Sequence, residues 1–392
     1  MTIETLTKEL NRLYEEIVGN RRYLHQNPEL SFQEEKTSRF IADTLKSYGI
    51  SVQENVGDKG VVGIVQGSEH GKTIAFRADF DALPIEDQKE VTYKSTVPGV
   101  MHACGHDGHT AALLAVAKVL QKHRDSIHGT AKFIFQPAEE KPPGGAKFMI
   151  EEGVLDGVDY VFGAHLATDL PVGKLSTASG AAMASVDAFT IQIFGKGGHG
   201  ARPHETKDSI IAATQLVQHL QQIVSRRINP TEAAVVTVGS IHAGNAFNVI
   251  ADSAVLEGTV RALNKDVRAQ IEKEIRAILE GLKITNYIDF ELDYLHGYPV
   301  LVNPVEEATI VEQFIKEQFG DSAFIQKAPV LGAEDFAYYL QEKPGNFFYV
   351  GAHNDDPNTQ YSHHHPKFDF DERALLNTGE MFLKIANHFL ID

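Results

Sequence analysis

The order of strand and helix patterns is the feature that most restricts the fold of this 392-residue chain. In the first half, apolar runs typical of strands occur at 61–66, 73–79, 130–136 and 160–166. Helical patterns at about 110–123 and 145–152 separate the later runs, and an N-terminal helix ends near Asn27-Pro28. Strands that alternate with helices favour a mostly parallel sheet covered by helices. This half therefore predicts an α/β domain.

The pattern changes near residue 183. Strand patterns follow at 186–195, 233–241, 253–261 and 287–294, with helical patterns at 207–226 and 265–282. The order β-α-β-β-α-β is typical of a split-βαβ, ferredoxin-like unit. After Pro299 helical patterns return, together with one more strand at 346–352. We therefore expect a larger domain built from 1–182 and 297–392, with a smaller domain inserted at 183–296.

Charge and cysteine content exclude several classes of partner. The chain has 36 Lys and Arg against 53 Asp and Glu, a net charge of -17. Such a surface repels phosphate backbones and anionic lipids, so we expect neither nucleic acid nor membrane as a partner. The single cysteine, Cys104, cannot form an internal disulfide. The N-terminal segment is charged and no apolar run is long enough to cross a bilayer, so we expect a cytoplasmic protein.

Polar residues gather where the predicted strands end. Asp79 ends one strand, Glu139 and Glu140 follow the next, and His165 lies near the end of a third. The loop after 346–352 carries His363, His364 and His365, and the segment HACGHDGH, residues 102–109, opens a helix. Ligands of open α/β sheets bind at the carboxyl ends of the strands. We therefore expect these side chains to meet at one edge of the sheet.

Each of these residues alone has an ordinary structural explanation. Single histidines are often hydrogen-bonded residues of the core, adjacent glutamates are often solvated, and a buried cysteine often packs as a small apolar residue. Together they offer thiolate, imidazole and carboxylate, the ligands that divalent transition metals select. The competing chemistry is a cysteine nucleophile, with His106 or His102 as its base. That chemistry leaves the paired glutamates unused, whereas a two-metal hydrolytic centre uses them.

Four motifs carry a resemblance to a known family. They are Cys104-Gly-His106-Asp-Gly-His109, residues 135–140, Gly163-Ala-His165 and residues 364–372. They resemble the metal-dependent amidohydrolases, which include hippurate hydrolase, N-acyl-amino-acid amidohydrolases and indole-acetyl-amino-acid hydrolases, relatives of aminoacylase and carboxypeptidase G. Segments 76–85, 195–204 and 332–339 match as well. The resemblance implies a zinc-exopeptidase-like catalytic domain, with the inserted domain acting as a lid that forms a homodimer or a larger homo-oligomer.

The resemblance also implies a cofactor and its ligands. Two divalent ions, Zn or Mn with Co or Ni also compatible, would bind at Cys104, His106, Glu140, His165 and His364. Cys104 would lie between the ions, with His106 and His165 completing one site. Glu140 and His364 would complete the other. Glu139 would be the general base, and Asp79 would orient groups of the metal centre.

Three residues of the inserted domain are implied to contact substrate. Asn248 and Arg261 would bind the substrate carboxylate, and His199 would bind the oxygen of the scissile carbonyl. We expect His199 to act on the metal centre of the neighbouring subunit, because the contacts of a two-fold dimer are reciprocal.

The expected activity is hydrolysis of the amide bond of an N-acyl amino acid or a small dipeptide. An aminopeptidase or dipeptidase acting on free N-termini is an alternative, in which Glu334-Asp335 would bind the amine. A metal-binding scaffold without activity is another. The chain has Ala251 where relatives usually have proline, and its EEKPPGGA segment is bulkier than the usual glycine-rich one. Both departures leave the acyl preference open.

Overall fold

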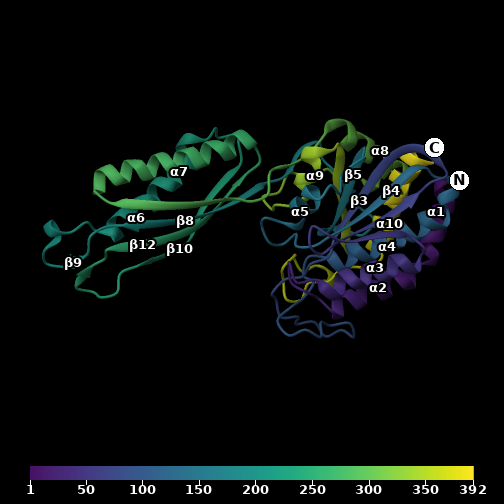
Figure 1. Ribbon diagram of the computed structural model, residues 1–392, viewed down its shortest axis with the longest axis horizontal. Coiled ribbons are helices and arrows are strands. Elements are labelled where there is room, and N and C mark those ends of the chain that lie inside the picture. Colours follow the sequence, from purple (N-terminus) through teal and green to yellow (C-terminus); the bar gives the residue numbers. More distant parts are fainter. Residues whose placement is uncertain (392) are drawn as a thin grey trace. The chain divides into compact units, whose positions relative to one another are not determined.

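The computed structural model describes residues 1–391, which form two compact units (Figure 1). The larger unit comprises Met1–Gly180, Val302–Ala328 and Asp335–Asp392. The smaller unit comprises Ala181–Leu301 and Pro329–Glu334, so the chain re-enters it after first leaving it. Short strands β7 (Gly180–Met183) and β14 (Leu301–Asn303) lie where the chain passes from one unit to the other.

The larger unit is built on a seven-stranded mixed sheet of order β1-β2-β4-β3-β5-β15-β6. Its strands are β1 (Ser51–Val56), β2 (Gly60–Gln66), β3 (Glu69–Asp79), β4 (His128–Gln136), β5 (Tyr160–Pro171), β6 (Leu175–Ser176) and β15 (Gly345–His353). The four strands β4, β3, β5 and β15 run parallel to one another, and the pairings at both edges are antiparallel. The predicted α/β class is confirmed.

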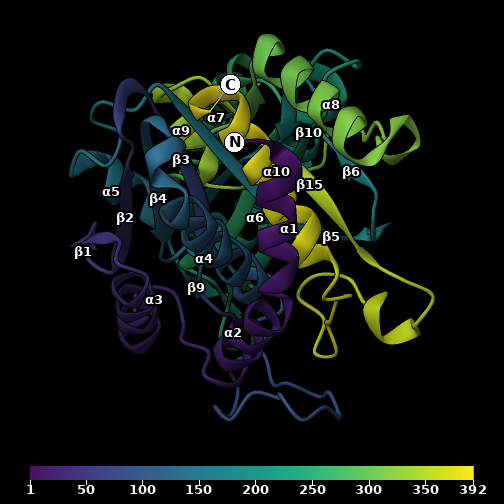
Figure 2. The ribbon, with the colours of Figure 1, turned by 90° about the vertical axis from the view of Figure 1, so that its right-hand side faces the viewer.

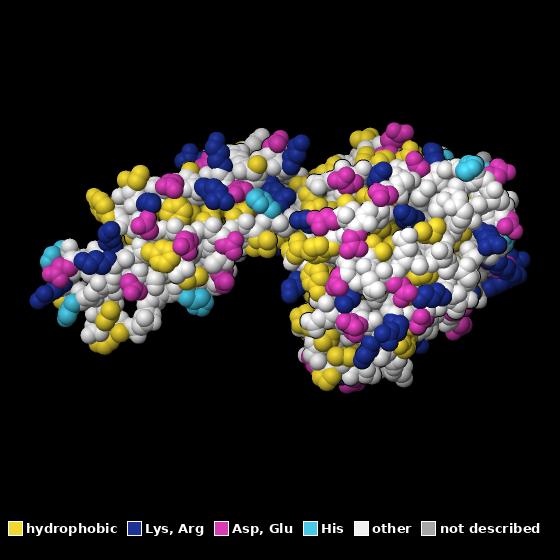
Figure 3. Space-filling model, viewed as in Figure 1, with side chains coloured by type: hydrophobic (Ala, Val, Ile, Leu, Met, Phe, Trp, Pro, Cys, Tyr) yellow, Lys and Arg dark blue, Asp and Glu magenta, His cyan; other side chains and the backbone are white. Residues whose placement is uncertain are grey.

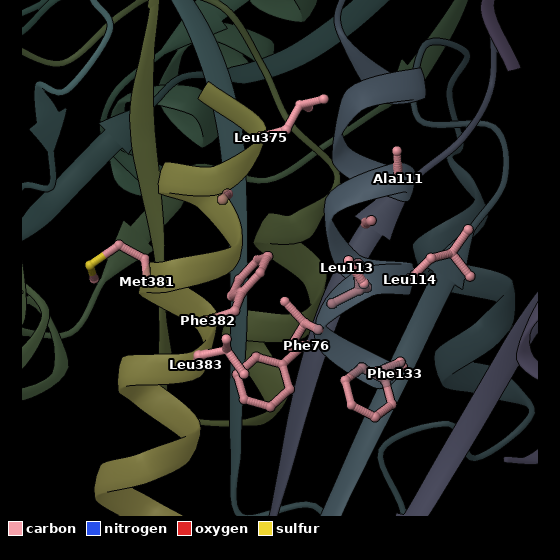
Figure 4. Packing of buried hydrophobic residues seen from close by; sticks show 14 of the residues in the cluster. Phe76, Ala111, Leu113, Leu114, Phe133, Leu375, Met381, Phe382 and Leu383 are labelled. Atoms are coloured by element: carbon pink, nitrogen blue, oxygen red, sulfur yellow. The ribbon is translucent and has the colours of Figure 1, made fainter. Parts of the chain in front are cut away.

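Helices cover this sheet. They are α1 (Ile3–Arg12), α2 (Tyr14–Gln26), α3 (Glu35–Ser47), α4 (His106–Lys122), α5 (Gly145–Glu151), α8 (Val305–Phe319), α9 (Phe336–Glu342) and α10 (Ala374–Leu390). α4 is buried from His106 to Ala117 because it packs between the sheet and its helical neighbours, α1, α2 and α10 (Figure 2). In the core, Phe76 of β3 contacts Phe133 of β4 and Phe382 of α10 (Figure 4).

Two helix boundaries differ from the prediction. α4 begins at His106, four residues earlier than expected, after Gly105 adopts a left-handed conformation with φ 91°. The polar residues of its first turn concealed the helix, since they interrupt the apolar pattern although the structure buries them. The single N-terminal helix expected up to Asn27 is in fact two, because the chain leaves helical geometry at Leu13.

The smaller unit is a four-stranded antiparallel sheet of order β10-β12-β8-β13. Its strands are β8 (Ser185–Phe194), β10 (Ala234–Ala243), β12 (Ser253–Ala262) and β13 (Asp289–His296), and its helices are α6 (Ser209–Gln222) and α7 (Lys265–Asn286). Along the chain these elements follow the predicted β-α-β-β-α-β order. Two short strands, β9 (Gly198–His199) and β11 (Val249–Ile250), pair beyond one end of the sheet (Figure 1).

Acidic and basic side chains both occur over the visible face of each unit (Figure 3). Among residues 1–391, none of the helices combines the length and the apolar character that a bilayer crossing requires.

Candidate metal centre

The expected site residues of the larger unit come from segments that the sheet brings together. β4 ends at Gln136, just before Glu139 and Glu140. β5 continues to Pro171, but its pairing with β3 stops at Gly163, so His165 lies just beyond the part that β3 covers. The backbone N–H of His364 donates to the carbonyl of Ala103 at 2.8 Å. This bond ties the loop after β15 to the segment that carries Cys104.

Among the described residues, five groups of three side chains could hold a metal ion, and two of these groups share Cys104. Cys104, His106 and His165 form one set, and Cys104, Glu140 and His364 form the other, with the donor atoms of each set within 4.8 Å of one another. The Sγ atom of Cys104 lies 3.5 Å from Nε2 of His165, and Oε1 of Glu140 lies 3.3 Å from Nε2 of His364. Cys104 belongs to both sets, so its sulfur lies between two adjacent sites.

Hydrogen bonds determine which ring nitrogens are available to a cation. Nδ1 of His106 lies 3.0 Å from the carbonyl oxygen of Asp81, and Nδ1 of His165 lies 2.7 Å from that of Leu166. A carbonyl oxygen only accepts, so each Nδ1 carries a proton and each Nε2 is left for another partner. Nε2 of His106 is buried and has no hydrogen-bond partner among the described residues. A metal ion would satisfy it.

The charge around His106 also favours a cation. Although burial opposes it, the carboxylates of Asp79 and Asp81 raise the pKa of His106 to about 10. In the metal-free chain this negative charge therefore attracts a proton to Nε2. A divalent cation would compete for the same place because it meets the same carboxylates. Burial, with the neighbouring imidazoles of His109 and His363, keeps the pKa of His165 well below its usual range, so this ring is neutral.

Cys104 has the surroundings of a ligand rather than of a nucleophile. Burial and the carboxylates of Glu140 and Glu139 raise the pKa of its thiol well above the usual range. Reactive cysteines need the opposite, a positive environment that lowers the thiol pKa. A bound cation would reverse the balance and stabilise the thiolate. Sulfur, imidazole nitrogen and carboxylate oxygen together fit divalent transition metals.

Three further histidines, His102, His363 and His365, are in none of the groups of possible metal ligands. His363 donates from Nε2 to the carbonyl of Leu166 at 2.9 Å, and His365 stacks on Tyr361 with ring centroids 4.4 Å apart. Of the three consecutive histidines, His364 is the one that faces Glu140. His102 is fully buried, and burial lowers its pKa to about 3. It therefore stays neutral.

Asp79 is held in a buried network. Its Oδ1 lies 2.6 Å from Nδ1 of His109, and its Oδ2 accepts from Arg77 at 2.7 Å. Its Oδ2 also lies 3.6 Å from Nε2 of His106. Burial is the largest influence on the pKa of Asp79, but the interactions with His106, Arg77 and His109 outweigh it and hold that pKa well below the usual range.

Sequence reasoning gave no role to three residues of this network, Asp81, Arg77 and Gln136. Asp81 orients His106, and the only signal for it was its position two residues after Asp79. Arg77, fully buried, donates to Asp335 Oδ1 at 2.8 Å and to Gln136 Oε1 at 2.8 Å. Asp335 also accepts from Gln136 Nε2 and from the backbone of Ala146. Its carboxylate is therefore occupied by the protein and is not free to bind a substrate amine.

Glu139 belongs to neither of the two donor sets that share Cys104, although it forms further groups of possible donors with His106 and Glu140 and with Glu334 and Asp335. Its side chain is nearly buried, and its Oε2 is 4.0 Å from Nε2 of His106. The preceding residue, Ala138, has a positive φ of 56°, and its N–H donates to Oε1 of Glu34 at 2.8 Å. Glu34 thus fixes the turn that presents Glu139.

In the smaller unit, His199 and Asn248 are neighbours. His199 pairs with Val249 in the β9–β11 ribbon, and Gly200 N–H donates to the carbonyl of Asn248 at 2.9 Å. Nδ1 of His199 accepts from the N–H of Ala201 at 3.0 Å, so its Nε2 carries the proton. The exposed ring therefore presents an N–H donor.

Arg261 lies at the other end of the sheet. β12 pairs with β8 from Ser253, opposite Phe194, to Ala262, opposite Ser185. Since β9 follows Phe194, and Ser253 lies eight residues before Arg261, about 26 Å separates the two ends. The structure therefore does not bring Arg261 together with Asn248 within one chain, although both were expected to bind the same carboxylate.

Comparisons with known proteins agree with these features. The family described as peptidase family M20/M25/M40 matches residues 75–388. YhaA of Bacillus subtilis is 51% identical over 390 residues, covering 98% of both chains. N-acetyl-L-cysteine deacetylase of the same organism is 41% identical, covering 97% of this chain and 90% of its own.

A solved structure extends the similarity to three dimensions. The YXEP protein of Bacillus subtilis, described as a dinuclear metal binding peptidase from the M20 family, is 35% identical with a TM-score of 0.83. The alignment covers 96% of this chain and 98% of that one.

Proposed function

This chain belongs to peptidase family M20/M25/M40 and is a hydrolase of amide bonds, and from that premise we propose that it cleaves N-acyl amino acids. The observation that carries the proposal is Glu139, which lies beside two sets of metal-binding donors that share Cys104. The similarity to N-acetyl-L-cysteine deacetylase supports the substrate class, because that enzyme's name describes removal of an acyl group from an amino acid.

The cofactor in this proposal is a pair of divalent ions, Zn or Mn, with Co or Ni also compatible with the donors. Cys104, His106 and His165 would hold one ion, and Cys104, Glu140 and His364 the other. When bound, such ions act as Lewis acids that make water more acidic and polarise a carbonyl oxygen. Two adjacent sites are supported by Nε2 of His106, which has no hydrogen-bond partner in the described part of the chain, and by the shared sulfur of Cys104.

Glu139 moves the proton. Its carboxylate takes a proton from the attacking water while the water oxygen bonds to the carbonyl carbon. It then returns the proton to the amide nitrogen as the C–N bond breaks, releasing a carboxylic acid and an amino acid. The position of Glu139 supports this role, since it is nearly buried and belongs to neither of the two donor sets that share Cys104. Asp79 and His109 hold the surrounding groups in place.

We further propose that one active site takes residues from two protomers of a homodimer. The N–H at Nε2 of His199 would donate to the carbonyl oxygen, and Asn248 lies beside it. Arg261 has a planar fork that suits the substrate carboxylate. Because about 26 Å separates the two ends of the smaller unit's sheet, a small substrate cannot bridge them within one chain. Contributions of Arg261 from one protomer and His199 from its partner avoid this difficulty.

Peptide hydrolysis is the second candidate activity. It is favoured by the family description and by the solved relative, both of which are called peptidases. The leaving amino acid would be the same, and only the acyl side would differ. The occupied carboxylate of Asp335 disfavours the version in which this residue binds a free amine.

A substrate panel tests these activities. The protein is stripped of metal, reloaded with Zn, Mn, Co or Ni, and assayed on N-acetyl-leucine, hippurate and Leu-Gly. We expect turnover of the two acyl amino acids to exceed that of the free dipeptide. Faster cleavage of Leu-Gly would favour the dipeptidase, and no turnover with any metal would contradict both.

A further inference from the structure

The guanidinium of Arg21, on α2, is fully buried among carboxylates. Its Nε donates to Oδ2 of Asp107 at 2.9 Å. Its two terminal nitrogens donate to Oδ1 of Asp369 at 2.8 Å and to Oε1 of Glu372 at 3.2 Å. Each nitrogen of the fork therefore contacts a different acidic residue. A guanidinium suits this arrangement because its N–H donors point in fixed directions.

Aromatic rings hold the guanidinium from its faces. The Cζ atom of Arg21 lies 4.8 Å from the ring centre of Tyr93 and 4.3 Å from that of Phe370. The hydroxyl of Tyr93 donates to Oδ2 of Asp369 at 2.8 Å, so one of these rings is itself bonded to the network. The hydrogen bonds therefore restrict the guanidinium within its plane, and the two rings restrict it perpendicular to that plane.

The three acids belong to two segments that carry proposed metal ligands. Asp107 directly follows His106 at the start of α4, whereas Asp369 and Glu372 follow His364 in the loop before α10. His106 and His364 belong to different donor sets. Arg21 therefore connects the segment of one proposed metal site with the segment of the other, although it contacts no ligand in the described hydrogen bonds.

A second buried chain of bonds spans the same two segments. Oδ2 of Asp107 also lies 2.7 Å from Nδ1 of His25, and Nε2 of His25 lies 2.7 Å from Nζ of Lys89. Lys89 donates in turn to the carbonyl of Phe368 at 2.8 Å. Both chains of hydrogen bonds include Asp107, so the first turn of α4 is bonded to both.

We propose that Arg21 is a positioning residue that sets the spacing between the two metal sites. This proposal depends on the metal centre proposed above. Arg21 holds the segments of His106 and His364 together before any ion binds, so the ions meet donors that are already arranged. Without the fork, binding an ion must also order these segments, and the affinity falls.

Titration of the metal-free protein with Co²⁺ tests the proposal. Calorimetry gives the stoichiometry and dissociation constants, and the visible absorption of Co²⁺ reports its coordination. We expect wild type to bind two ions, and Arg21→Lys to bind at least one of them about 10- to 100-fold more weakly, with an altered spectrum. Lysine keeps the positive charge but cannot contact three carboxylates from one planar fork.

Arg22 provides the matched control. It pairs with the same Glu372, at 2.9 and 2.7 Å, but its side chain is 43% exposed and contacts neither Asp107 nor Asp369 in the described hydrogen bonds. Arg22→Gln should therefore leave both dissociation constants within about threefold of wild type, as is typical of exposed ion pairs.

Folding is checked by circular dichroism and gel filtration before each titration. If Arg21→Lys does not fold, Asp369→Asn is titrated in its place, because asparagine keeps the shape of the side chain and removes the charge that Arg21 binds. Unchanged affinity and spectrum in the folded variant would overturn the inference, whereas weaker binding would support it. Failure of wild type to bind Co²⁺ would instead contradict the proposed metal centre.

Discussion

His109 and Asp79 form a buried pair in which Nδ1 of the histidine lies 2.6 Å from Oδ1 of the aspartate. The other ring nitrogen, Nε2, accepts the backbone N–H of Leu166 at 2.9 Å. Both nitrogens of His109 are therefore occupied, and the ring links β3 to the residue after His165. In His106, three residues earlier, Nε2 is buried and has no hydrogen-bond partner among residues 1–391.

This difference predicts opposite outcomes for the two histidines. His106→Ala should lower the bound metal from two ions to one per chain, because it removes a donor. His109→Ala should retain two ions but bind them about 10- to 100-fold more weakly, since it only supports the ligands. Metal analysis after equilibrium dialysis distinguishes the cases. Loss of an ion in His109→Ala alone would show that the two roles have been exchanged.

Substitutions of the adjacent glutamates Glu139 and Glu140 should also have different effects on turnover and metal content. Glu139→Gln should reduce turnover to the limit of detection while metal content stays near wild type, because the role proposed for Glu139 is that of a base and not of a ligand. Glu140→Ala should lose metal, because Oε1 of Glu140 belongs to the set with His364. Activity and metal analysis are measured on the same samples. Metal loss in Glu139→Gln, with Glu140→Ala fully loaded, would reverse the assignment.

Cys104 should behave as a ligand. Cys104→Ser should weaken metal binding, and in wild type a chelator should abolish activity that added metal restores. The raised pKa of the thiol means that the metal-free protein should react slowly with alkylating reagents at neutral pH. Activity that persists after thorough chelation but disappears on alkylation would establish a cysteine nucleophile.

Glu34 predicts a dependence of stability on pH. Burial, with the charge of Asp81, raises the pKa of Glu34 from 4.5 to about 8. The folded state therefore binds a proton that the unfolded chain releases above pH 4.5, so stability falls as pH rises toward 8. Glu34→Gln removes this titration and keeps an oxygen that can accept the N–H of Ala138. The wild-type Tm should therefore fall more than the variant's between pH 5 and 9.

The control for this measurement is Glu35→Gln. Glu35 is next in the chain, but its side chain is 71% exposed and pairs with Lys59 on the surface. The Tm of Glu35→Gln should change with pH in the same way as the Tm of wild type. Parallel Tm curves for wild type and Glu34→Gln would refute a raised pKa at Glu34.

His199 should complement a defect in another chain. Glu139→Gln and His199→Ala are each expected to be inactive, and they are mixed under conditions that allow subunits to exchange. A mixed dimer then has one site with both Glu139 and His199 intact, so activity should return to a fraction of wild type. Exchange is demonstrated with differently tagged chains. An inactive mixture despite exchange would show that His199 serves its own chain or takes no part in catalysis.

Much of this architecture could be predicted from local patterns. The strands that end at Asp79 and Gln136 could be predicted because a short apolar run between turn signals is recognisable from the local sequence alone. The start of α4 was not, because Asp107 and His109 look like residues of an exposed loop. Their burial depends on partners far away in the chain, such as Arg21, 86 residues before Asp107.

The sequence by itself determined the order of the elements, the insertion of a ferredoxin-like unit and the kinds of donor atom available. Only the tertiary structure decided which groups each buried histidine contacts. His106 is oriented by Asp81, 25 residues away, and His109 is occupied by Asp79, 30 residues away. The physical reason is that a buried imidazole must satisfy its nitrogens with whatever groups the fold places beside it. Those groups come from other strands, and no local pattern specifies them.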